Sequence, residues 1–143
     1  MSYRYIASAL IICSLVLALA GCGEKVKPVS TEGYTTLPSG LKYKVEKEGT
    51  GRRPIEWDTV IVNYEGKLLD GRVFDSSYET NKPLTLRLSK VIKGWTEGVQ
   101  MMKEGAIYEF IIPPDLAYGD EAAGPLITPN STLYFKIELL KVF

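Results

Sequence analysis

The side chains that could do chemistry in this chain are carboxylates and tyrosines. The sequence contains no histidine, and its two cysteines, Cys13 and Cys22, lie near the N-terminus. These absences exclude histidine-based catalytic triads, histidine or cysteine-cluster metal sites and the usual near-neutral general base. Any reaction therefore depends on carboxylates, tyrosines, backbone groups or the shape of a pocket, and we expect neither a metal nor a cofactor.

Two short motifs contain such groups, FDSS at residues 74–77 and AYG at residues 117–119. Each also has a plain structural explanation, since Asp75 could cap a turn with its side chain and Tyr118 could be a turn aromatic. A serine hydrolase is disfavoured because Ser76 and Ser77 have no histidine partner and no GxSxG elbow is present. A glycosidase would need two carboxylates across one cleft, and the sequence identifies no second carboxylate to pair with Asp75.

The elements that would position these groups are mostly strands. Residues 41–48 (LKYKVEKE) and 133–139 alternate apolar and polar side chains, as half-buried strands do. In residues 59–68, Val60, Val62 and Tyr64 share one face, and in residues 106–112 Phe110 and Ile112 share one face. In residues 133–139, the odd-numbered residues are apolar and share one face, which leaves Tyr134, Lys136 and Glu138 on the other. The pattern predicts an antiparallel sheet with one covered face.

One short helix is predicted, from Gly94 or Trp95 to about Met102. Trp95, Val99 and Met102 recur there at helical spacing. One such helix is about enough to cover the apolar face of a small twisted sheet. The predicted fold class is therefore α+β.

The N-terminus has the layout of a secretory signal peptide. After Arg4, the apolar run from Ile6 to Ala20 is shorter than the roughly 20 residues that a spanning helix needs. The four residues that end at Cys22 (LAGC) resemble the lipobox of bacterial lipoproteins, in which the cysteine is acylated and the preceding peptide removed. We interpret residues 1–21 as a signal peptide ending in a lipobox and Cys22 as the site of lipidation. The alternative is an ordinary signal peptide whose removal leaves an incidental free thiol.

Residues 22–38 are interpreted as the acylated cysteine and a flexible linker, because the stretch from Gly23 to Thr36 is polar and has no apolar pattern. We expect one domain over residues 39–143, and we expect the chain from about Leu37 to fold and work alone. The 17 basic and 17 acidic side chains balance without a block of like charge. Nucleic acid is therefore not an expected partner.

Four segments in a fixed order give the chain a more specific resemblance: VNYEGKLLDGRVFDSS, VIKGWTEGVQMM, PPDLAYG and STLYFKIELLK. Together they resemble the FKBP family of peptidyl-prolyl cis-trans isomerases, from about Ser39 to Phe143. The resemblance implies a curved antiparallel β-sheet wrapped around one short α-helix, with a pocket between them. This agrees with the α+β fold that periodicity predicts.

The resemblance also implies which residues form the pocket. Matched motif to position, Asp75, Tyr118 and Phe74 would be catalytic, with Asp75 as the polar group and the Ile92 backbone N–H as a donor to the ligand. The expected substrate-binding residues, with Trp95 at the floor, are Tyr64, Val91, Ile92, Trp95, Ile127 and Phe135.

Two features qualify that assignment. Leu84 and Leu86 stand where some family members have aromatic side chains, so one wall of the pocket is less aromatic. Periodicity alone favours ordinary core packing as the explanation of four aromatic residues: Tyr64, Phe74, Trp95 and Phe135.

The implied function is a peptidyl-prolyl cis-trans isomerase that assists the folding of extracytoplasmic proteins. It would be lipid-anchored in the bacterial cell envelope, at the outer membrane and facing the periplasm in a Gram-negative cell. The expected partners are X-Pro segments of folding proteins, macrolide inhibitors and, through the lipid anchor, the membrane; a monomer is expected. The alternative is a proline-directed binding module or holdase chaperone that uses the same pocket with little turnover.

Overall fold

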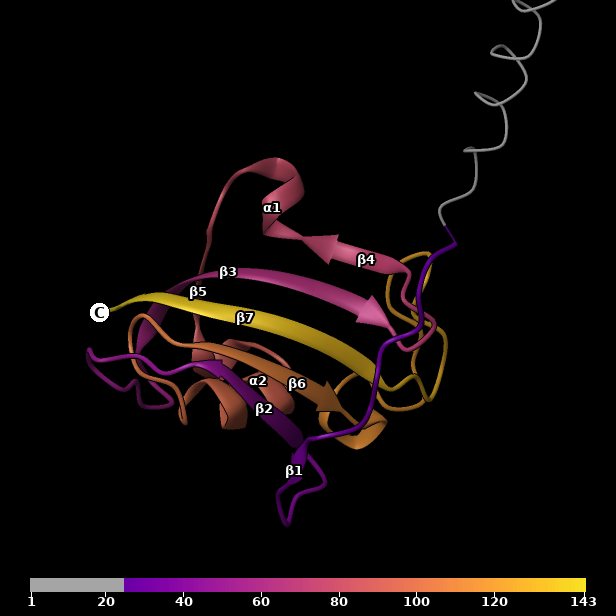
Figure 1. The fold of residues 1–143 in the computed structure, drawn as a ribbon, viewed down its shortest axis with the longest axis horizontal. Coiled ribbons are helices and arrows are strands. Elements are labelled where there is room, and N and C mark those ends of the chain that lie inside the picture. Colours follow the sequence, from indigo (N-terminus) through magenta and orange to yellow (C-terminus); the bar gives the residue numbers. More distant parts are fainter. Residues whose placement is uncertain (1–24) are drawn as a thin grey trace, which may run out of the picture.

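The computed structural model describes residues 25–143, which form a seven-stranded sheet with short helices (Figure 1). The predicted signal peptide and Cys22 lie outside the described residues. From residue 25 onward, no helix combines the length and apolar character required to cross a membrane.

The elements of this domain are short, apart from two strands of ten residues. Along the chain they are β1 (Thr35–Thr36), β2 (Lys42–Lys47), β3 (Thr59–Leu68), β4 (Val73–Ser76), α1 (Ser77–Thr80), β5 (Leu84–Arg87), the 3₁₀ turn η2 (Leu88–Lys90), α2 (Lys93–Val99), β6 (Ile107–Ile112), the 3₁₀ turn η3 (Pro114–Leu116) and β7 (Leu133–Val142).

All strand pairs of the sheet are antiparallel, in the order β1-β2-β6-β7-β3-β4, and β5 also pairs with β3. On the side away from β7, β3 pairs with two short strands in succession. Its first half pairs with β5 through Thr59–Val62, and its second half pairs with β4 through Glu65–Lys67. Because the chain leaves β4, crosses α1 and returns as β5, these two short strands form the rim of the sheet near α1 (Figure 1).

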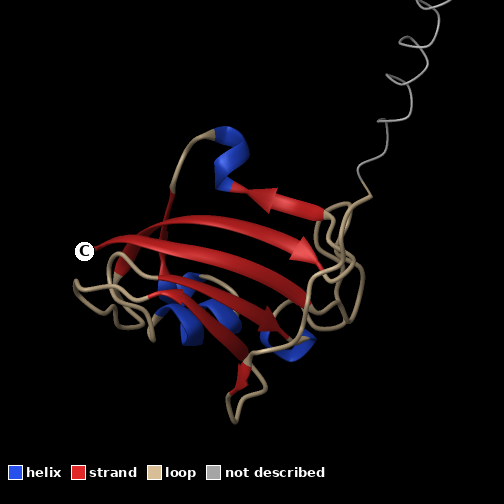
Figure 2. Cartoon of the chain, in the orientation of Figure 1, coloured by secondary structure: helices blue, strands red, loops and turns tan. Residues whose placement is uncertain are grey.

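The α2 helix lies against one face of the curved sheet, as Figure 2 shows. Its approach is close because glycine occupies two positions on the contact face. A Cβ at Gly94 would lie 2.5 Å from Ile112 Cγ2, and one at Gly98 would lie 2.6 Å from Phe110 Cε1. Trp95 and Val99 of the helix are buried in the same core as the inward side chains of β3, β6 and β7.

The predicted α+β class and the curved antiparallel sheet around one short helix are confirmed. The strand predicted at residues 59–68 has those bounds, and its residues alternate strictly between buried and half-buried. The helix starts at Lys93 and ends at Val99, earlier than predicted, and Met102 is buried in the turn that follows. Sequence periodicity gave no prediction of β4, α1 or β5, which have four residues each.

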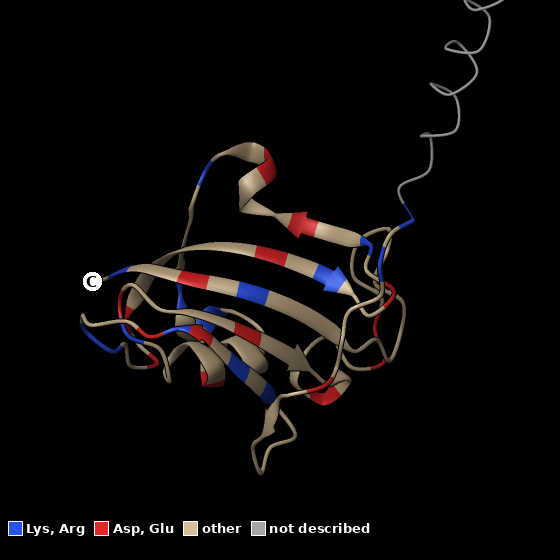
Figure 3. Ribbon diagram, viewed as in Figure 1, with Lys and Arg blue, Asp and Glu red and all other residues tan. Residues whose placement is uncertain are grey.

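The outward face of the sheet is polar and its charges alternate in sign (Figure 3). Lys136 Nζ lies 2.9 Å from Glu46 Oε2, and Lys67 Nζ lies 2.7 Å from Glu65 Oε1. Exposed or half-exposed ion pairs of this kind contribute little to stability. They are consistent with a sheet whose other face holds the core.

Residues 25–36, here called the strap, differ from the flexible linker that the sequence predicts. The Val29 N–H donates to the Leu69 carbonyl at 2.9 Å, and the Tyr34 hydroxyl donates to Glu109 Oε2 at 2.6 Å. Thr35 and Thr36 form β1 against β2. Main-chain pairing and one tyrosine hydrogen bond fix this segment, and neither requires an alternating apolar pattern. The boundary at residue 39 stays a prediction.

Tyr134 shows a consequence of the strap. It faces away from the core, as the alternation of β7 predicts, and yet only 8% of its surface is exposed. Its side chain lines a cavity on the outer face together with Pro28, Val29 and Tyr34 of the strap. Burial raises the pKa of Tyr134 above its ordinary value. The outward face of β7 is therefore not free surface at this position.

Replacing Tyr34 with phenylalanine tests whether the strap stabilises the domain. We expect Tyr34→Phe to lower the free energy of unfolding by about 1 kcal/mol, because the hydrogen bond to Glu109 is lost while the ring remains. Urea denaturation of residues 25–143 measures the change. The control is Tyr78→Phe, since Tyr78 is 48% exposed, and it should change the free energy by less than about 0.5 kcal/mol. Equal effects of the two substitutions would show that the hydrogen bond between Tyr34 and Glu109 does not stabilise the domain.

Candidate active site

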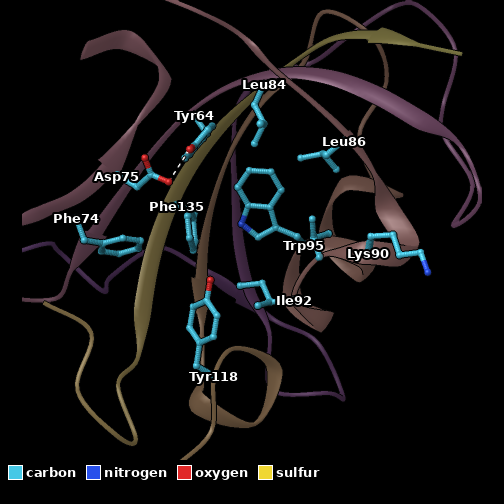
Figure 4. A pocket seen from close by; sticks show the side chains of 11 residues that line it. Tyr64, Phe74, Asp75, Leu84, Leu86, Lys90, Ile92, Trp95, Tyr118 and Phe135 are labelled. Carbon is cyan, nitrogen blue, oxygen red and sulfur yellow. Dashed lines mark hydrogen bonds between the residues drawn. The ribbon is translucent and has the colours of Figure 1, made fainter. Parts of the chain in front are cut away.

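A cavity of about 310 Å³ opens between the sheet and α2 (Figure 4). Apart from Asp75 and Lys90, its walls consist of aromatic and aliphatic side chains from β3, β4, β5, β7, α2, the two residues before α2 and the loop after η3. The lining residues are Tyr64, Phe74, Asp75, Leu84, Leu86, Lys90, Val91, Ile92, Trp95, Tyr118 and Phe135.

Four aromatic rings form the inner part of the cavity through edge-to-face contacts. The Trp95 and Phe135 ring centroids are 5.3 Å apart at 89°, and Tyr64 meets Trp95 at 5.4 Å and 78°. Phe74 meets Phe135 at 5.4 Å and 86°. Each such contact contributes about 0.5–1.5 kcal/mol beyond burial, so the rings hold one another in fixed orientations. The floor of the cavity is therefore rigid as well as apolar.

Gly66 explains how β3 accommodates two of these rings. It lies opposite Phe135 in the β3–β7 ladder. A Cβ at this position would lie 2.7 Å from Phe74 Cζ and 2.8 Å from Phe135 Cε1. Any larger residue would push these rings out of their positions, so the shape of the wall depends on this glycine.

The carboxylate of Asp75 is held by a tyrosine of the wall. The Tyr64 hydroxyl donates to Asp75 Oδ2 at 2.6 Å, drawn as a dashed line in Figure 4. Burial, and then the hydrogen bond and charge of Asp75, raise the pKa of Tyr64 well above its ordinary value. Tyr64 therefore remains a protonated donor at neutral pH, and Asp75 has one fixed oxygen.

The neighbours of Asp75 exclude the turn-capping explanation of the FDSS motif. The residue that caps α1 is Ser76, whose Oγ accepts from the Tyr78 N–H at 3.2 Å. Ser77 Oγ accepts from the Tyr64 N–H at 2.9 Å and ties α1 to β3. Asp75 itself pairs with Gly66 in the β3–β4 ladder, which presents its side chain to the cavity.

Tyr118 and Ile92 lie along another side of the cavity. Tyr118 is 42% exposed, and its hydroxyl points toward Phe135 in Figure 4. The turn that carries it is closed by a hydrogen bond from the Gly119 N–H to the Pro114 carbonyl at 2.9 Å. Ile92 caps α2, and its carbonyl accepts from the N–H groups of Trp95 and Thr96. The peptide units on this side are thus fixed by local hydrogen bonds.

Eight of the nine pocket residues expected from the sequence line the cavity together. The exception is Ile127, which is buried in the core and pairs with Ala123 across the loop that follows Tyr118. Leu84 and Leu86 form an aliphatic wall, as their positions in the sequence indicate. Lys90 was not predicted, because a single exposed lysine gives no sequence signal; only the 3₁₀ turn η2 brings it to the rim.

The Tyr64–Asp75 bond gives a prediction for the titration of Tyr64. In Asp75→Asn, we expect the pKa of Tyr64 to fall but to stay above the ordinary value, since burial, the largest cause, remains. The pKa of Tyr64 is higher in the folded protein than in the unfolded chain. Its contribution to the free energy of unfolding is therefore fully present below about pH 10 and is lost as the pH rises above that value. NMR titration of ¹³C-labelled tyrosine measures both proteins. No change in Asp75→Asn would mean that the bond is absent in solution.

Comparison with known proteins identifies the family. Residues 50–140 match the family model described as FKBP-type peptidyl-prolyl cis-trans isomerase. A probable FKBP-type isomerase FkpA from Neisseria meningitidis is 51% identical over 111 residues, which cover 78% of this chain and 41% of that protein. The outer membrane protein MIP of Legionella longbeachae is 50% identical over 113 residues, 79% of this chain and 48% of that protein.

A solved structure shows the same architecture. The crystal structure of FkpA from Escherichia coli superposes with a TM-score of 0.74 at 50% sequence identity, over 78% of this chain and 52% of that one. This chain thus spans about half the length of the relatives it matches. The match of the family model and of these relatives, together with the cavity between the sheet and α2, shows that the chain belongs to the FKBP-type peptidyl-prolyl cis-trans isomerase family.

Proposed function

We propose that this protein catalyses cis-trans isomerisation of X-Pro peptide bonds in its aromatic cavity. The observation that supports this most directly is the floor of Trp95, Phe135 and Tyr64 beside a single fixed carboxylate. Such a cavity can accept a proline ring and exclude water from the amide next to it. The described residues 25–143 include no cluster of histidine, cysteine, aspartate or glutamate that could hold a metal ion.

The chemistry requires a twisted amide to be favoured over both planar forms. Rotation about an X-Pro bond is opposed by roughly 18–20 kcal/mol of lost conjugation. The planar amide is polar through resonance, and twisting removes that charge separation. Transfer from water to an apolar cavity therefore disfavours the planar forms relative to the transition state. An acceleration of 10⁵ requires about 7 kcal/mol of such differential stabilisation.

We assign the polar groups of the cavity to orientation. The Ile92 N–H and the Tyr118 hydroxyl would donate to carbonyls that flank the proline, while Asp75, fixed by Tyr64, would provide the negative side of the cavity. Phe74 would complete the wall behind Asp75. None of these groups has to transfer a proton.

An assay with pocket variants tests the activity. A coupled assay on a Leu-Pro peptide should show strong acceleration over the spontaneous rate. Tyr118→Phe should lower kcat/KM about 2- to 10-fold, the effect of one lost hydrogen bond. Phe135→Ala should lower it further, but the substitution also removes about 3–5 kcal/mol of stability, so folding must be verified first.

The matched controls are Tyr78→Phe and Trp57→Ala, which alter exposed aromatic residues outside the cavity. Both should retain kcat/KM within about twofold of the parent. If the parent binds the peptide without accelerating its isomerisation, the protein is a proline-directed binding module or holdase, which is the alternative function. Unchanged activity in well-folded Tyr118→Phe and Phe135→Ala would place the site elsewhere.

We further propose that the protein assists the folding of extracytoplasmic proteins from a lipid anchor at Cys22. The lipobox-like LAGC sequence and the apolar run before it support this proposal. The relative from Legionella longbeachae is named an outer membrane protein. Because the strap begins at residue 25, only three residues after Cys22, such an anchor would hold the domain close to the cell-envelope membrane. Macrolide inhibition and the monomeric state stay predictions.

Replacing Cys22 with serine tests the anchor. In fractionated cells, we expect the full chain in the membrane fraction and Cys22→Ser in the soluble fraction, since acylation would be its only attachment. Cys13→Ser is the matched control, and it should leave the membrane fraction unchanged because Cys13 would be removed with the signal peptide. If the Cys22→Ser protein remains in the membrane fraction after washing with high salt and carbonate, the lipoprotein proposal fails.

A further inference from the structure

The mouth of the cavity has one fixed negative group and one positive group. Among its lining residues, only Asp75 and Lys90 carry a formal charge at neutral pH. Figure 4 shows them on opposite sides of the Trp95 ring, with the Lys90 ammonium directed outward from the rim. A peptide that places its proline over Trp95 would therefore extend toward a carboxylate on one side and toward an ammonium on the other.

The backbone at Lys90 is firmly positioned. Lys90 ends the 3₁₀ turn η2, and the first residue of that turn, Leu88, is fully buried. The Leu88 N–H donates to the Asp58 carbonyl at 3.1 Å, and Thr96 Oγ1 donates to the Leu88 carbonyl at 2.6 Å. The turn is thereby tied to the loop before β3 and to α2. The ammonium can move on its four-carbon stem, but its base stays at the rim.

The charge of Lys90 is available to a ligand. Within residues 25–143, no carboxylate lies within 4.0 Å of its Nζ. Arg87 and Lys93 are exposed on the same stretch of chain, so basic residues occur at three-residue intervals along this side. Arg87 donates through Nε to the Trp57 carbonyl and is not a lining residue. Lys90 is the basic side chain that reaches the cavity.

The wall beside Lys90 suits a side chain that is partly apolar. Leu84 and Leu86 of β5 line the cavity, and Val91 follows Lys90 directly. The methylene groups of a glutamate could cover this aliphatic surface while its carboxylate approaches the ammonium. An uncharged glutamine of the same shape would gain only the first contact. The difference between the two isolates the effect of charge.

We propose that Lys90 is a specificity-determining residue that favours X-Pro segments with a glutamate next to the proline. This proposal rests on the proposed isomerase activity and names a substrate class for the same cavity. The ion pair would form at the rim, in contact with solvent. Such a pair gives a preference of about 2- to 5-fold and weakens as salt is added.

The experiment measures kcat/KM for peptides that differ only beside the proline. One set has glutamate, glutamine or lysine immediately before the proline, and a second set has them immediately after it. At low ionic strength, we expect glutamate to exceed glutamine by about 2- to 5-fold in one of the two sets, which also identifies the position that faces Lys90. In that set, the ratio should fall to about 1 in Lys90→Gln, reverse in Lys90→Glu and approach 1 in about 0.5 M salt.

Lys47→Glu is the matched control, because Lys47 is an exposed lysine of β2 that does not line the cavity. It makes the same change in net charge and should leave the glutamate-to-glutamine ratio as in the parent. A ratio that is the same in the parent, Lys90→Gln and Lys90→Glu overturns the proposal. A neutral Leu-Pro peptide distinguishes failure of the specificity proposal from failure of the isomerase activity itself. If that peptide is not accelerated, the isomerase proposal fails, and the same ratios are then measured as Kd values by calorimetry.

Discussion

The close approach of α2 to the sheet is the constraint on which the rest of this structure depends. Gly94 and Gly98 allow the helix to rest directly on Ile112 and Phe110, where any Cβ would overlap them. A seven-residue helix is only about 10 Å long, whereas ten-residue strands such as β3 and β7 extend about 33 Å. The helix therefore covers part of the concave face. The cavity occupies the space beside α2 that the helix is too short to fill.

This origin explains why site and core share residues. Trp95, Phe135 and Tyr64 are at most 9% exposed and belong to the core, yet each has an edge on the cavity. Replacing any of these three side chains with a smaller one would remove both core packing and part of the cavity wall. The exposed groups at the mouth, Tyr118 and Lys90, are the positions where specificity can change at little cost in stability. Stability constrains the floor of the site much more than its rim.

The sequence was most informative where burial alternates over many residues. The bounds of β3 follow from ten residues of strict alternation, while the four residues of β5 are too few to distinguish a strand from a loop. The contacts of the strap could not be predicted because they use main-chain bonds and Tyr34, which leave no periodic pattern. For the site, eight of the residues that the resemblance implies line the cavity, whereas Ile127 is buried in the core beside it; Lys90 had no motif to indicate it.

The Tyr64–Asp75 pair shows how an apolar cavity can include a charge without losing its apolar character. A fully buried carboxylate would cost several kcal/mol in desolvation unless it were paired. Here the charged residue is exposed at the rim, and the buried partner is a neutral tyrosine whose raised pKa keeps its proton in place. The hydrogen bond fixes the carboxylate from below while water solvates it from above. The amide of a bound proline would thus lie between an oriented charge and a dry aromatic floor, and the twisted, less polar amide gains from that floor.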